Sequence, residues 1–120
     1  MKLNQFAVYR VNKNTEGREL WHLSYQEAMS QKLSIQIEFY KQMNVGKLKD
    51  GETANDLWKR MKNRCEISDV LVINQGGEIS CYYMNEDYPQ RLVGFIRLNP
   101  SGTLITLDTE NFRIDGKAGN

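Results

Sequence analysis

Asp69-Val-Leu-Val-Ile-Asn-Gln-Gly-Gly-Glu-Ile-Ser-Cys-Tyr-Tyr-Met84 is the stretch that decides the fold. It contains two runs of β-branched and aromatic residues, residues 69–74 and residues 78–84, on either side of the glycine pair Gly76-Gly77. Glycine readily adopts the positive φ angles that a tight hairpin turn demands. The stretch therefore predicts two antiparallel strands joined at the glycine pair.

The first strand of this hairpin is apolar on both faces of the pleat, because residues 70–73 are Val, Leu, Val and Ile. We expect such a strand to be central in its sheet and covered on both sides, with the helices as the cover on one side. A turn at the glycine pair places Cys81 opposite Val72 and away from Cys65. The two cysteines are therefore expected to be free thiols.

Further strands are predicted upstream and downstream of the hairpin from the alternation of apolar and polar residues. They cover residues 5–11, 35–40, 91–98 and, after the turn at residues 99–102, residues 103–107. The segment Asn44-Val-Gly46 is interpreted as the turn that ends or reverses the second of them. The second half of the chain is thus expected to be a β-meander.

Two short helices are predicted from capping signals. Ser24 and Glu27 have the spacing of a capping box, which starts a helix that runs to about residue 32. Thr53 and Asp56 precede an amphipathic stretch that runs to about residue 63. The predicted fold class is therefore α+β, with a single mixed or antiparallel sheet of about five to six strands in the order β-α-β-α-β-β-β(-β).

Length and composition are those of one small globular domain. The chain has 120 residues, of which 40% are hydrophobic and 26% charged, and its formal net charge is +1. We expect a single domain over residues 1–107 and a loosely ordered tail over residues 108–120. No segment is apolar for the ~20 residues that a membrane span requires, so we expect no membrane association and a cytoplasmic location.

Residues that would support catalysis or metal binding are scarce. His22 is the only histidine, and it has no Ser or Cys neighbour in the sequence. The two cysteines have neither zinc-site spacing nor a histidine pair beside them. We therefore expect no catalytic residue, no metal and no cofactor.

A basic cluster is the most distinctive local feature, and it consists of Lys59, Arg60, Lys62 and Arg64. Cations at the end of a helix complement its dipole, and commonly they simply face water. The alternative is that they bind an acidic partner, either another protein or, less favoured, nucleic acid. Both alternatives stay open at the level of the sequence.

Three tyrosines form a second candidate surface at the end of the hairpin, namely Tyr82, Tyr83 and Tyr88. Adjacent residues of a strand point to opposite faces, so at most one of Tyr82 and Tyr83 can be exposed. Tyrosine is enriched at protein interfaces because its ring is apolar and its hydroxyl is polar. The group is therefore a candidate contact for a partner, with plain packing as the alternative.

Five segments together resemble the YodL-like domain family of bacterial proteins. They are Phe6-Ala-Val-Tyr-Arg-Val11, Glu52-Thr-Ala-Asn-Asp-Leu-Trp58, Ser68-Asp-Val-Leu-Val-Ile73, Ile79-Ser-Cys-Tyr-Tyr-Met84 and Arg91-Leu-Val-Gly-Phe95, and the turn Asn44-Val-Gly-Lys-Leu48 fits as well. The resemblance covers about residues 6–98. It departs from the family pattern at Asn63-Arg-Cys-Glu-Ile67, which stands where a longer segment is usual.

The resemblance implies an uncharacterised accessory domain that brings no catalytic residues. Such domains are found mostly in Firmicutes, often in large proteins of plasmids and integrative elements, and the tail here is similar to the start of segments that continue further. Together with the absence of a catalytic motif, this predicts a non-enzymatic protein-interaction domain with an unknown partner. The alternative is an accessory protein of a mobile element that contacts nucleic acid through the basic end of its second helix.

Overall fold

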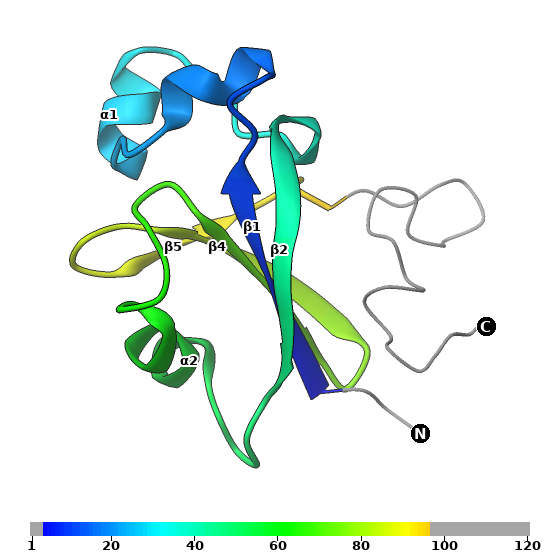
Figure 1. The fold of residues 1–120 in the computed structure, drawn as a ribbon. Helices are drawn as coiled ribbons and strands as arrows, with labels where there is room; N and C mark the ends of the chain where they lie inside the picture. Colours follow the sequence, from blue (N-terminus) through cyan, green and yellow to red (C-terminus); the bar gives the residue numbers. More distant parts are fainter. Residues whose placement is uncertain (1–3, 97–120) are drawn as a thin grey trace.

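The computed structural model describes residues 4–96. Nine elements follow one another along them: β1 (Asn4–Val11), η1 (Glu16–Leu20), α1 (Tyr25–Ser30), η2 (Ile37–Phe39), β2 (Tyr40–Lys47), α2 (Ala54–Met61), β3 (Val70–Gln75), β4 (Glu78–Met84) and β5 (Pro89–Leu92). The labels η1 and η2 denote short 3-10 helices. The predicted α+β class is confirmed, and Figure 1 shows the strands between two groups of helices.

All neighbouring strands of the five-stranded sheet are antiparallel, and their order is β2-β1-β3-β4-β5. The doubly apolar strand β3 lies at the centre, as predicted, because only a central strand can bury both of its faces. The hairpin of β3 and β4 has the predicted register, with Val72 opposite Cys81. Both cysteines are free. The antiparallel order of β3, β4 and β5 confirms the meander for the described strands.

Alternate residues of β1 and β3 build two separate cores, one on each face of the sheet. Ala7, Tyr9, Val70 and Val72 face a core that also contains Ala28 of α1. The opposite face holds Leu57, Trp58 and Met61 of α2. The expectation that both helices cover one side is therefore wrong. An amphipathic pattern shows that a helix must bury one face, but it does not say which side of the sheet receives it.

The second predicted strand is also placed wrongly. Residues 37–39 form η2, and the observed strand β2 runs through residues 44–46, which the sequence suggests are a turn. Ile37 is buried in the core, while β2 is largely polar and exposed. The apolar alternation over residues 35–40 therefore marked residues that pack in the core and not residues that pair as a strand. Gly46 lies under the ring of Phe6, where a Cβ atom would come 2.6 Å from Phe6 Cζ.

The helix starts agree with the capping signals, and the strand predicted over residues 91–98 is found earlier in the chain, as β5 over Pro89–Leu92. Ser24 with Glu27 and Thr53 with Asp56 each form a complete capping box. Strand β5 ends at Leu92, although Phe95 is still buried in the core beside α1. The strand predicted over residues 103–107 and the tail over residues 108–120 lie outside the described residues, as does the end of the predicted domain.

Candidate functional site

The basic cluster at the end of α2 is divided by the structure into three exposed cations and one that serves the fold. Lys59, Lys62 and Arg64 are exposed, whereas Arg60 is half-buried. Lys62 extends over Trp58, with its Nζ 5.2 Å from the ring centroid. Among residues 4–96, none of the three exposed cations lies within ion-pair distance of a carboxylate.

Arg60 is held by Glu52, the residue just before the capping box of α2. Its Nε and Nη2 atoms donate to the two carboxylate oxygens of Glu52, each over 2.8 Å. The bonds from Arg60, together with one from the Lys49 N–H, lower the pKa of Glu52 to about 2. Arg60 also lies over the ring of Phe6. Arg60 therefore fastens α2 to the sheet, and it is not available to a partner.

The three candidate tyrosines separate in the same way. Tyr83 is fully buried and donates its hydroxyl to the carbonyl of Leu23 over 2.7 Å, and burial raises its pKa. Tyr82 points to the opposite face, where it is partly buried against the α2 core beneath Arg91. Tyr88 is 41% exposed. Of the three, only Tyr88 presents a large exposed surface.

A cleft of about 240 Å³ lies between the end of α2 and the loop that leaves β4. Its walls bring together the residues after α2 and the residues at the end of β4, which are far apart in sequence, and they consist of Lys62, Asn63, Cys65, Glu66, Ile67, Met84, Asn85 and Glu86. Of the predicted site residues only Lys62 lines it, with Arg64 and Tyr88 close by in sequence. Burial raises the pKa of the Cys65 thiol to about 12, so this cysteine is not a reactive thiolate at neutral pH.

Asn85 is the unusual residue of this cleft. It is 9% exposed, and its Oδ1 accepts a hydrogen bond from the Tyr25 N–H over 2.7 Å. Its Nδ2 is buried and has no hydrogen-bond partner among the described residues. An unsatisfied buried donor costs roughly 1–3 kcal/mol, so Asn85 is a candidate for contact with an external group.

A second, larger cleft of about 330 Å³ lies where η1 meets the segment that follows α1. Four charged side chains, Glu16, Arg18, Glu19 and Lys32, contribute to its walls. In the part of the chain that the structure describes, no buried polar side-chain atom of this cleft lacks a partner. The smaller cleft is therefore the better candidate.

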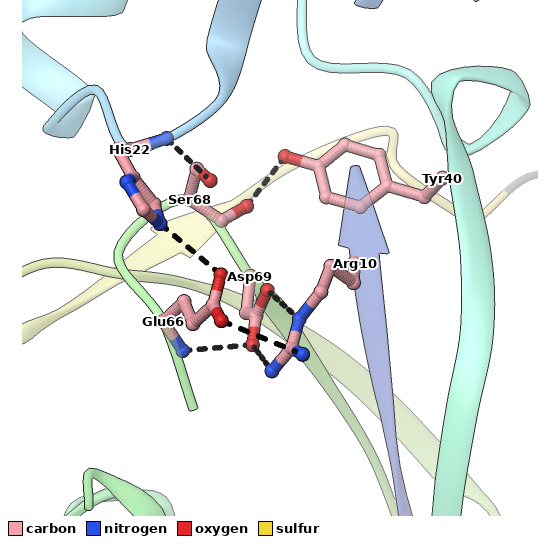
Figure 2. A network of polar contacts seen from close by, with 6 residues as sticks. All are labelled: Arg10, His22, Tyr40, Glu66, Ser68 and Asp69. Carbon is pink, nitrogen blue, oxygen red and sulfur yellow. Dashed lines mark hydrogen bonds and ion pairs between the residues drawn. The ribbon is translucent and has the colours of Figure 1, made fainter. Parts of the chain in front are cut away.

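Figure 2 shows a polar network centred on Asp69, and one of its members, Glu66, also lines the smaller cleft. The Asp69 side chain is 0% exposed, and Arg10 donates to both of its oxygens, from Nε over 3.1 Å and from Nη2 over 2.9 Å. The backbone N–H of Glu66 donates to the same carboxylate over 2.9 Å. Burial raises the pKa of Asp69, while Arg10 opposes that shift.

Glu66 connects this network to the cleft. One of its oxygens lies 3.1 Å from Nε2 of His22, the other lies 3.6 Å from Nη1 of Arg10, and the residue also lines the cleft. His22 and Ser68 both have positive φ angles, of 66° and 86°, and the His22 N–H donates to Ser68 Oγ over 3.1 Å. Such backbone strain persists only where the surrounding contacts hold it in place.

This network has a structural role in every contact that the structure shows. The Ser68 side chain is buried, and its hydroxyl oxygen accepts a hydrogen bond from the His22 N–H. The Ser68 carbonyl accepts from the hydroxyl of Tyr40 over 2.7 Å. His22 faces a carboxylate, but Ser68 does not present its hydroxyl to solvent. Within residues 4–96, no three side chains of His, Cys, Asp or Glu gather as metal ligands.

Most residues of the cleft and the network were not identified from the sequence. The overlooked residues are Arg10, Glu66, Ser68, Asp69 and Asn85. Two signals were available: Arg10 is a charge inside an otherwise apolar strand, and Ser68-Asp69 stands directly before the central strand. Either signal predicts a buried polar contact, but neither predicts which residue of the chain forms the other half of that contact.

Comparisons with protein-family models, with curated proteins and with solved structures found no match. In the part of the chain described here, no helix is long and apolar enough to cross a membrane. The similarity to the YodL-like family thus stays a prediction from sequence.

Proposed function

We propose that this chain is a non-enzymatic protein-interaction domain whose partner-binding face is the cleft at the end of α2 together with the exposed cations around it. One observation carries this proposal: the wall of the cleft contains an exposed lysine, Lys62, and also Asn85, whose buried amide donor lacks a partner among residues 4–96. The lysine ammonium and the amide NH2 group both form favourable hydrogen bonds with a partner that is rich in acceptor oxygens.

Charge supports a partner that is acidic at this face. Lys59, Lys62 and Arg64 stand on one end of α2, and none of them is engaged in an ion pair among residues 4–96. Rim charges of this kind steer a partner of opposite sign and set the orientation in which it docks. The exposed Tyr88 lies three residues after Asn85, and its carbonyl accepts a hydrogen bond from the Asn85 N–H. The resemblance to accessory domains of mobile elements favours a bacterial cytoplasmic partner.

Affinity copurification of the tagged chain from a bacterial lysate tests this proposal. We would compare the native chain with the variant Lys59→Glu/Lys62→Glu/Arg64→Glu, which reverses the exposed cations and leaves Arg60 in place. The matched control, Lys32→Glu/Lys41→Glu/Lys47→Glu, changes the net charge equally at exposed lysines elsewhere. We expect a stoichiometric protein that is retained by the native chain and the control and lost with the first variant.

The same experiment, repeated with nuclease and at two salt concentrations, distinguishes a protein partner from nucleic acid. Neutralising phosphates releases counterions, so nucleic-acid binding weakens steeply as salt rises. A partner that disappears with nuclease would overturn the protein-interaction proposal in favour of nucleic acid. Equal retention by both triple variants would show that the face at the end of α2 is not the contact.

A further inference from the structure

The orientation of the Asn85 amide is determined by its neighbour. The Tyr25 N–H at the start of α1 donates to Oδ1 over 2.7 Å. If the amide were rotated, its NH2 group would face that N–H, and two donors would meet. Oδ1 therefore accepts the Tyr25 hydrogen bond, and the Nδ2 group is a buried donor of fixed direction in a residue that lines the cleft.

The wall of the cleft contains two more side chains with N–H donors, Lys62 and Asn63, and one of them, Asn63, also carries an acceptor oxygen. The carboxylate of Glu66 is engaged by His22 and Arg10, which leaves Glu86 as the one exposed carboxylate of the wall. Trp58 also has a buried N–H without a partner in the described chain, but it lines neither cleft. The wall is thus suited to a group that accepts hydrogen bonds.

The size of the cleft limits what can enter. About 240 Å³ is below the roughly 300–1,000 Å³ that is typical of small-molecule sites. The cleft volume is several times the ~30 Å³ that one water molecule occupies in the liquid. A short side chain can therefore enter the cleft. A carboxylate of aspartate or glutamate is the side-chain group that combines this size with strong acceptor oxygens and a charge opposite to that of Lys62.

We infer that the cleft is a carboxylate pocket: it receives an Asp or Glu side chain from an acidic segment of the partner protein, with Asn85 Nδ2 and Lys62 Nζ as the donors. The inference rests on the proposed function and names its partner chemistry. Because Nδ2 is buried, the adjoining loop at Glu86 must move to expose it before a carboxylate can accept its hydrogen bond.

A pair of isolated side-chain probes tests the pocket directly. We would titrate the isotope-labelled chain with N-acetyl-aspartate N-methylamide and, as the matched control, N-acetyl-asparagine N-methylamide, at constant ionic strength. The readout is the NMR signal of the Asn85 side-chain NH2 group. We expect a saturable shift with the aspartate probe and at least a roughly tenfold weaker response with the asparagine probe, since a charged acceptor forms the stronger bond. No saturable shift, or equal shifts for both probes, would overturn the inference.

Two variants assign the donors. Asn85→Asp keeps an oxygen for the Tyr25 N–H but loses the donor, so we expect the aspartate probe no longer to bind. Lys62→Met keeps an apolar stem over Trp58 and loses the charge, and we expect roughly tenfold weaker binding. The backbone NMR spectrum shows whether each variant is folded. Unchanged probe affinity in folded Asn85→Asp would contradict the pocket.

The copurification distinguishes the failure of this inference from the failure of the proposed function. A partner that is retained equally by the native chain and by Asn85→Asp would leave the interaction domain standing and overturn the carboxylate pocket. If instead the aspartate probe binds at Asn85 while no protein is retained, the pocket stands and the proposed function fails.

Discussion

Two forked arginine–carboxylate pairs stabilise this domain, and their surroundings differ. In both pairs one arginine donates to the two oxygens of one carboxylate, Arg10 to Asp69 and Arg60 to Glu52. The pKa of Glu52 is lowered to about 2, chiefly by its bonds to Arg60, whereas that of Asp69 is raised because burial outweighs Arg10. Both carboxylates are buried, with 5% of the Glu52 side chain and 0% of the Asp69 side chain exposed. The same kind of ion pair therefore outweighs the cost of burial before α2 and only partly offsets it beside the central strand.

The largest expected effect comes from Arg10→Met, which leaves the Asp69 charge buried without its partner. Breaking such a pair costs about 3–5 kcal/mol of unfolding free energy, which urea unfolding at pH 7 would measure. Without Arg10 the effect of burial is less opposed, so the folded-state pKa of Asp69 rises further in the variant, and the loss should shrink as falling pH protonates Asp69 there first. The double variant Arg10→Met/Asp69→Asn is the control and should recover stability. A loss below about 1 kcal/mol in Arg10→Met would show that the pair is not the anchor we describe.

A smaller effect is expected from Glu52→Gln, which weakens the two bonds from Arg60. A hydrogen bond to a charged group contributes roughly 1.5–3 kcal/mol, so we expect the unfolding free energy to fall by about 2 kcal/mol at pH 7. The folded-state pKa of about 2 lies below the ordinary value of 4.5, so this stability is present above pH 4.5. It is lost as the pH falls from 4.5 through 2. Unfolding curves of variant and native chain should converge over that interval, and a difference that persists below pH 2 would contradict the assignment.

The smallest effects concern Ser68, the strained neighbour of Asp69. Ser68→Ala removes the acceptor of the His22 N–H and keeps the positive φ, so we expect a loss of about 1–2 kcal/mol in thermal or urea unfolding. Ser68→Gly removes the same acceptor but relieves the backbone strain, which is worth roughly 1 kcal/mol. The glycine variant should therefore be the more stable of the two. The reverse order would mean that strain at this position is negligible.

Local rules predicted the parts of the fold that depend on local chemistry. The Gly76-Gly77 turn specified both the hairpin and its register, and both capping boxes marked the helix starts. Strand β2 escaped detection because it is largely polar and exposed, and its register with β1 shifts between Val8 and Tyr9. The side of the sheet on which each helix packs depends on tertiary contacts that no local pattern contains.

The candidate site was predictable only in part, for the same reason. The basic end of α2 could be read from sequence, but the pairing of Arg60 with Glu52 could not, since it depends on how the loop before α2 folds back. Arg10 and Asp69 are 59 residues apart, and Tyr25 and Asn85 are 60 apart. Such meetings follow from the order of the strands in the sheet, which the sequence left open.

Three of the hydrogen bonds described above fasten residues 22–25 to distant residues of the sheet and its flanking loops. They join His22 to Ser68, Tyr25 to Asn85 and Tyr83 to Leu23, across separations of 46 to 60 residues. Their partners are held by β3, β4 and the loops that flank them, so we expect the segment between β1 and β2 to dock only once these strands are paired. Its amide protons should then exchange with solvent as one cooperative unit, sooner than those of β3, and each opening would release the Asn85 side chain from the Tyr25 N–H.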